Sequence, residues 1–295
     1  MIVRVVVGSL AAAWLALAVP VRADDAADLA AAAKAFDAGD YAQALKLSQA
    51  MADRGIPAGM RALGVIYLQG RGVPKDEATG ASWMIKAAEK GLAPSQHEAG
   101  ILFQNGIGVP KDAEQAAAWF QKAADQNFGV SWQALGRIAT EKKKPKEAEA
   151  AFRKASKIGV VGAMLDLAQN LVIQAEGMPS KEAKLAALTE AYQWVQTSLV
   201  AIPSGPARDE VHRQRQSLED LITQQDAVGA PRILAAAKKE GEAYAMKLRT
   251  EQTAAQDAAE GKAPAPKTSI TPSSAPPPTP KMPPPPANAS DPKSG

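Results

Sequence analysis

The chain has 295 residues, a formal net charge of +3 and no cysteine. This length allows one large domain or two of ordinary size. The missing cysteine excludes disulfides, a thiol nucleophile and thiolate metal sites, and a body close to neutral gives no argument for nucleic-acid binding.

Residues 1–23 have the pattern of a cleaved export signal. Arg4 precedes an apolar run from Val5 to Val19, and Val21-Arg22-Ala23 follows as a small-x-small cleavage sequence. The run is shorter than the roughly 20 residues that span a bilayer as a helix. We therefore expect export to the periplasm or the outside, without a stable membrane span after cleavage. A retained membrane anchor is the alternative.

Residues 24–57 predict a helical hairpin, with its turn at Gly39-Asp40-Tyr41 and a close helix contact at Ala44.

The chain then repeats itself. Gly70 to Asp76 reads GRGVPKD, and Gly106 to Asp112 reads GIGVPKD, 36 residues later. Self-similarity of this kind predicts stacked supersecondary units.

Each unit predicts two helices joined by a loop. Residues 58–69 carry apolar side chains at three- and four-residue spacing, which favours a helix. Gly70 can end this helix in a left-handed conformation, Pro74 breaks it, and Asp76 can cap the second helix. Glycines before Lys75 could also cradle a phosphate. However, a helix precedes this loop and a carboxylate follows the lysine, so we interpret the loop as a structural joint.

The pattern LG-x-x-Y-x-x-G-x-GV-x-x-D, followed by A-x-x-W-x-x-KAA-x-x-G, resembles the Sel-one-like repeat (SLR), a relative of the tetratricopeptide repeat (TPR). Residues 58–127 hold two such units. Residues 24–57 resemble a shorter TPR-like unit, and residues 128–202 resemble degenerate ones. The resemblance implies an all-α fold, a right-handed α-solenoid of helix-turn-helix repeats that acts as a protein-interaction scaffold.

Two further helices are expected in residues 203–261, one from Asp209 to Gln225 and one from Pro231 to about Ala259. The first would cap the open end of the stack. The second has a sparse apolar face, so we expect it to project as a stalk or to pack on a partner. Residues 262–295 hold twelve of the 22 prolines and predict a disordered, proline-rich tail.

Enzyme chemistry is not expected. A cysteine-rich secreted branch of the repeat family is associated with β-lactam binding or hydrolysis, but its paired cysteines are absent here. The helical body contains no Ser-x-x-Lys, and His97 and His212 fall on different predicted helices without metal-ligand spacing. We therefore expect no catalytic or metal-binding residues and no cofactor. The tryptophans after the signal (Trp83, Trp119, Trp132 and Trp194) are expected in the core.

The TPR comparison implies that the first helix of each hairpin lines the inner surface. Positions related by the 36-residue offset form rows across these helices. One row holds Arg61, His97 and Gln133, the next holds Val65, Ile101 and Arg137, and a third holds Leu68, Gln104 and Thr140. Polar side chains in such rows suit an extended peptide. The candidate partner-binding residues are therefore Arg61, His97, Gln104, Gln133 and Arg137. The alternative is that they are solvated or pack against neighbouring hairpins.

These features predict a non-catalytic exported scaffold or adaptor that binds a protein or peptide in the cell envelope and does not bind nucleic acid. An alternative function is binding of a cell-wall polymer such as peptidoglycan, through the tail and the basic turn of Lys142 to Lys144 with Lys146. A β-lactam-hydrolase-like enzyme is the third candidate.

Overall fold

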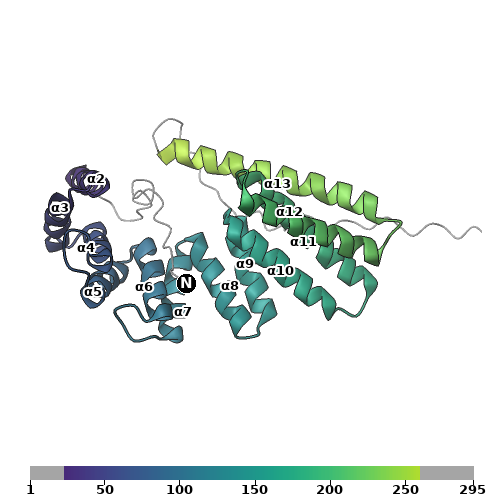
Figure 1. Ribbon diagram of the computed structural model, residues 1–295, viewed down its shortest axis with the longest axis horizontal. Coiled ribbons are helices and arrows are strands. Elements are labelled where there is room, and N and C mark those ends of the chain that lie inside the picture. Colours follow the sequence, from purple (N-terminus) through teal and green to yellow (C-terminus); the bar gives the residue numbers. More distant parts are fainter. Residues whose placement is uncertain (1–22, 260–295) are drawn as a thin grey trace, which may run out of the picture. The chain divides into compact units, whose positions relative to one another are not determined.

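The computed structural model describes residues 23–259, which form twelve α-helices and contain no strand (Figure 1). The proposed signal run and the proline-rich tail lie outside the described residues. The chain divides into two compact units, one ending at Ile158 and the other beginning at Gly159.

The first unit is a stack of four helical hairpins. Each helix packs on the one before it and the one after it, as the consecutive colours of Figure 1 show. An all-α solenoid is therefore confirmed. In chain order the helices are α2 (Ala23–Asp37), α3 (Tyr41–Asp53), α4 (Pro57–Gln69), α5 (Glu77–Glu89), α6 (Ala93–Asn105), α7 (Ala113–Asp125), α8 (Gly129–Glu141) and α9 (Pro145–Lys157).

The glycine-rich loops act as joints between these helices. Gly70 ends α4 in the left-handed region with φ 66°, and Asp76 accepts a hydrogen bond from the Thr79 N–H at 3.0 Å to begin α5. The second loop packs on the hairpin before it, because a Cβ on Gly108 would lie 2.0 Å from the carbonyl oxygen of Glu77. Glycine is required there by close approach as well as by its φ of 68°.

Small side chains dominate the core of the first unit and let its helices approach closely. Leu63, Met84 and Phe120 are the large side chains that fill the spaces between them. The fully buried alanines of this unit include Ala81, Ala87, Ala116, Ala123, Ala148 and Ala155.

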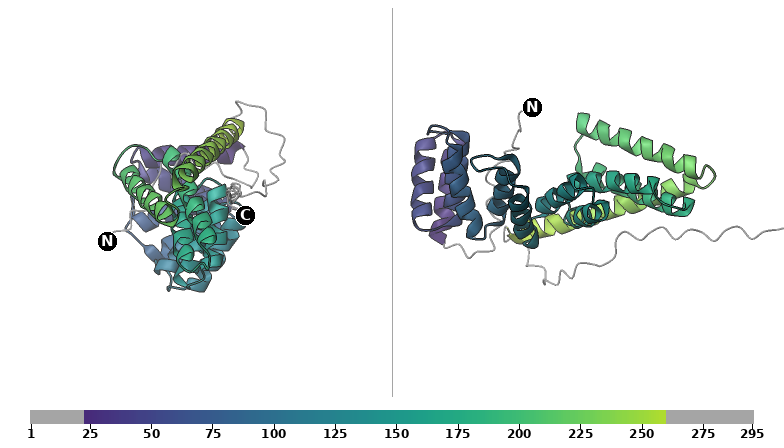
Figure 2. Two further views of the ribbon diagram at one scale, coloured as in Figure 1. Left: turned by 90° about the vertical axis from the view of Figure 1, so that its right-hand side faces the viewer. Right: turned by 90° about the horizontal axis from the view of Figure 1, so that it is seen from below.

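The second unit is built around one central helix. It comprises α10 (Val161–Glu176), α11 (Lys181–Ala201), α12 (Pro206–Gln225) and α13 (Ala230–Ala259), and α11 packs against the other three (Figure 2). Every residue from Ala191 to Leu199 is buried, as expected of a helix surrounded by others.

Helix α13 is not the projecting stalk that its sparse apolar face suggested. Ala237, Gly241, Ala245 and Leu248 form a narrow buried stripe along it. A Cβ on Gly241 would lie 2.7 Å from the carbonyl oxygen of Gln193 on α11. Small residues at helical spacing thus replace large apolar ones and bring the two backbones together.

Candidate functional site

Arg61 joins the two central hairpins of the first unit. On α4, its Nε and Nη2 donate to the two carboxylate oxygens of Glu98 on α6, at 2.8 and 2.5 Å. The side chains are 13% and 28% exposed, so the pair is partly shielded from water. This two-point geometry fixes one repeat on the next.

His97, in the same row, links α6 to α8 (Gly129–Glu141). On α6, its Nδ1 lies 2.9 Å from the Oγ of Ser131 on α8. The imidazole ring packs between Phe120 and Phe128, with ring centroids 5.2 and 5.4 Å away. Burial lowers the pKa of His97 to about 4, because the charged imidazolium would lose its hydration.

The remaining candidates lie on the same first helices. Gln104 is half-buried on α6, Gln133 is half-buried on α8, and Arg137 is exposed one turn beyond Gln133. Arg61 and His97 take part in contacts between repeats, while a partner-binding role for the five residues stays a prediction. The structure brings Gln133 and Arg137 together on one helix face but does not gather all five into one pocket.

A groove that the sequence did not suggest lies where the second repeat packs against the last helix of the first. It has a volume of about 400 Å³ and lies between the end of α5, the last turn of α6, the loop after α6 and the first half of α7. We call it the second-repeat groove. Its lining residues are Ile85, Glu89, Phe103, Pro110, Lys111, Asp112, Gln115 and Trp119.

Apolar and charged side chains share the second-repeat groove. Trp119, only 8% exposed, belongs to the core cluster that Phe103 and Ile85 pack against. Glu89 and Lys111 are exposed, and Asp112 uses its carboxylate to cap α7 through the N–H groups of Glu114 and Gln115, both at 2.9 Å. The groove therefore offers an apolar floor beside charged side chains of both signs. Its aromatic residues have the spacing of core residues, which is why the sequence pattern did not reveal it.

Lysines cover the tryptophans of the first unit. The Nζ of Lys86 lies 4.2 Å from the ring centroid of Trp83, and the Nζ of Lys122 lies 3.8 Å from the ring centroid of Trp119. In both pairs the lysine follows the tryptophan by one helical turn. In the last hairpin Lys154 on α9 covers Trp132 on α8 at 3.8 Å. Trp119 and Trp194 are buried, whereas Trp83 and Trp132 are half-buried beneath these lysines.

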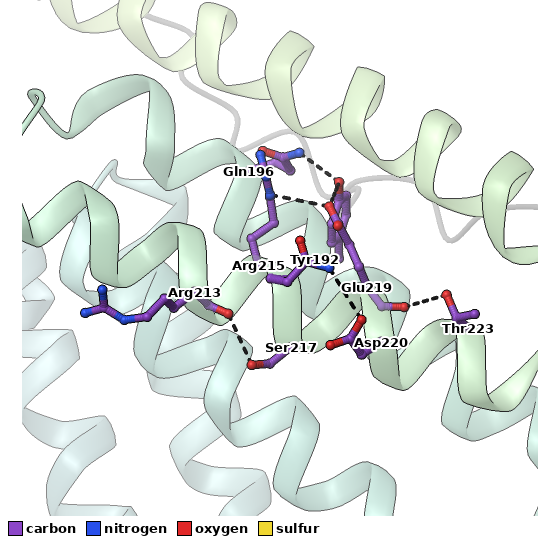
Figure 3. Close-up of polar contacts among 9 residues, drawn as sticks. Tyr192, Gln196, Arg213, Arg215, Ser217, Glu219, Asp220 and Thr223 are labelled. Atoms are coloured by element: carbon purple, nitrogen blue, oxygen red, sulfur yellow. Dashed lines mark hydrogen bonds and ion pairs between the residues drawn. The ribbon is translucent and has the colours of Figure 1, made fainter.

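The second unit holds a polar cluster that braces α12 against α11 (Figure 3). The hydroxyl of Tyr192 donates to Glu219 at 3.1 Å and accepts from the Gln196 amide at 2.9 Å. The Nε of Arg215 lies 3.4 Å from the same carboxylate. Burial raises the pKa of the Tyr192 phenol. The bond from Tyr192 to Glu219 crosses from α11 to α12, while the other two contacts lie within one helix and hold these side chains in place. We therefore interpret the cluster as structural.

The described residues lack two further features. Between residues 23 and 259 no three His, Asp or Glu side chains form a group that could hold a metal ion. No helix in the same range has the length and apolar character needed to cross a membrane.

Comparison with protein families identifies the repeat. The Sel1 repeat family model matches residues 57–92 and 93–128, the two units that carry the glycine-rich joints. The chain therefore contains two Sel1 repeats, as the sequence resemblance implied. Sel1 repeats generally mediate protein–protein interaction, and proteins of this kind are typically non-catalytic. No curated protein matches the chain.

Two solved structures of bacterial proteins are similar to this chain. A protective antigen of uropathogenic Escherichia coli strains, which displays an SLR fold, has 22% sequence identity and a TM-score of 0.50. The match covers 75% of this chain and 52% of the antigen, so the chain spans about half of that protein. A Sel1 repeat protein from Oxalobacter formigenes has 24% identity and a TM-score of 0.49, over 63% of this chain and 83% of that protein.

Proposed function

We propose that this chain is a non-catalytic, exported scaffold or adaptor that binds a protein or peptide partner in the cell envelope. The observation that carries the proposal is the second-repeat groove, an open surface of mixed chemistry built on a repeat that serves protein interaction. Its apolar floor suits side chains of a partner, and its polar edge suits a peptide backbone.

The contact between His97 and Ser131 is the place where catalysis would first be sought. A histidine within hydrogen-bond reach of a serine has the geometry of an activated nucleophile. Here, however, Ser131 is fully buried, and Phe120 and Phe128 enclose the ring. A substrate carbonyl could not reach the hydroxyl without opening the hairpins. This supports a structural role for the pair.

Export is proposed from the sequence of residues 1–23, which pairs a positive start and an apolar run with a small-residue cleavage sequence. The test is fractionation of cells that express the full chain with a C-terminal tag, followed by crosslinking and recovery from the envelope fraction. We expect the chain in that fraction, shortened by the signal, with a polypeptide crosslinked to it. Recovery from the cytoplasm alone would contradict export. Retention on purified sacculi with no crosslinked polypeptide would contradict the scaffold function.

A further inference from the structure

The chemistry of the second-repeat groove matches one class of peptide. Proline-rich segments in polyproline II conformation dock into grooves lined by aromatic residues, because their conformation is preformed and costs little entropy on binding. Half-buried Phe103 supplies aromatic surface, Ile85 adds apolar surface beside it, and Pro110 forms part of the wall. The exposed charges of the groove are the Glu89 carboxylate and the Lys111 ammonium, and a cation in the ligand would pair with Glu89.

The chain itself contains a segment of this chemistry. Residues 275–286 read APPPTPKMPPPP, in which Lys281 is the only charged residue between two proline runs. The segment lies in the 36 residues that follow the described structure, which ends at Ala259. It carries both features that the groove would recognise, a proline-rich backbone and one positive charge.

We propose that the second-repeat groove binds residues 275–286 of a second copy of this chain. The proline runs lie over Phe103 and Ile85, and Lys281 lies beside Glu89. This inference rests on the proposed function, because it uses the same groove as the docking surface. Each copy then offers one groove and one ligand segment. The resulting contact between copies is head-to-tail and can extend to further copies.

The first Sel1 repeat keeps Pro74, Lys75, Asp76 and Trp83 at the corresponding positions, but the helix before it differs. The 36-residue offset places Gln49 at the position of Ile85 and Asp53 at the position of Glu89. Gln49 donates its amide to Asp53 at 2.8 Å, so this carboxylate already has a hydrogen-bond partner and its apolar neighbour is missing. The structure therefore favours one docking site in each chain.

The test uses the full chain with a photo-crosslinking residue, benzoylphenylalanine, in place of Gln115 at the groove. A matched control places it at Gln121, an exposed glutamine on the same helix that does not line the groove. Unlabelled and nitrogen-15-labelled copies are mixed, irradiated and analysed by mass spectrometry. We expect crosslinks between light and heavy copies that join position 115 to residues 275–286, and none from position 121.

A competition experiment adds a second readout. A synthetic peptide of residues 275–286 should reduce these crosslinks at least severalfold, whereas a peptide with every proline replaced by alanine should not. Lys281→Glu should weaken the crosslink, while circular dichroism should show an unchanged fold. No crosslink to the tail, equal crosslinks from both positions, or crosslinks confined to single copies would each overturn the inference.

Failure of this inference is distinct from failure of the proposed function. If an envelope polypeptide is recovered with the chain but position 115 never reaches the tail, the scaffold function stands and the self-association is wrong. If the tail is captured but no envelope partner is found, the groove is an assembly surface only.

Discussion

Arg61 of the first Sel1 repeat and Glu98 of the second form a two-point ion pair that spans one repeat of the solenoid. His97, one residue before Glu98, continues the line by contacting Ser131 on α8. A row that was proposed as a partner surface thus also links the first helices α4, α6 and α8 in sequence.

The ion pair should contribute to stability because both side chains are partly buried. Arg61→Met leaves Glu98 without its partner, and we expect a loss of about 1–3 kcal/mol in the free energy of unfolding. Lys144→Gln is the control, since Lys144 and Glu147 pair at 53% and 63% exposure and should contribute well under about 1 kcal/mol. Urea unfolding measures both. Equal losses would show that Arg61 adds no more than a surface pair.

His97 should make stability depend on pH. Its folded pKa of about 4 lies below the ordinary value of 6.5, so protonation favours the unfolded chain. Stability is unaffected above about pH 7, falls as the pH drops from 6.5 towards 4, and levels off below that. The loss amounts to about 3 kcal/mol.

The measurement for this prediction is urea unfolding of wild type and His97→Leu at several pH values. Carboxylates titrate in both proteins, so the difference between the two isolates His97. Parallel curves between pH 7 and pH 4 would contradict the burial of this ring.

Gly108 should tolerate a side chain less well than another left-handed glycine. Both Gly108 and Gly39 have positive φ, at 68° and 81°, but a Cβ on Gly39 would meet nothing within 4 Å. We expect Gly39→Ala to cost about 1 kcal/mol from backbone strain alone. Gly108→Ala adds a clash with Glu77 and should cost on the order of 2–4 kcal/mol. Thermal unfolding of the two variants compares them, and similar costs would mean that the loop does not pack as described.

Tyr192 should fasten α12 to α11 through its hydroxyl. Tyr192→Phe keeps the ring but removes the partner of Gln196 and Glu219. We expect a loss of about 1–2 kcal/mol and faster amide hydrogen exchange in α12 than in α10. Unchanged exchange in α12 would show that the apolar contacts of Val211, Leu218 and Ile222 hold this helix without the hydroxyl.

Local chemistry made the repeat joints predictable. Gly70, Pro74 and Asp76 each act on their own backbone or on the next few residues, so the sequence pattern alone placed the end of α4 and the start of α5. Contacts between segments distant in the sequence could not be predicted in this way. Arg61 looked like an available donor because Glu98, 37 residues further on, is brought to it only by stacking of the repeats.

Packing by small residues was the main difference between expectation and structure. Ala237, Gly241 and Ala245 add little to an apolar pattern, yet they allow α13 to lie against α11. The sequence pattern did not reveal the second-repeat groove, because its aromatic residues look like ordinary core residues. Phe103 and Trp119 have the spacing of core residues, and only the fold shows that they also border an open groove.

The proposed function depends most on binding of a polypeptide in the second-repeat groove. Its most direct test is crosslinking recovery from envelope fractions with wild type, Gln115→Arg and Gln121→Arg, all as full chains. Gln115→Arg places a bulky cation at the groove, whereas Gln121→Arg places the same change elsewhere on α7. We predict that Gln115→Arg recovers at least about tenfold less partner, equivalent to roughly 1.4 kcal/mol, while Gln121→Arg matches wild type. Equal recovery by all three would contradict the claim.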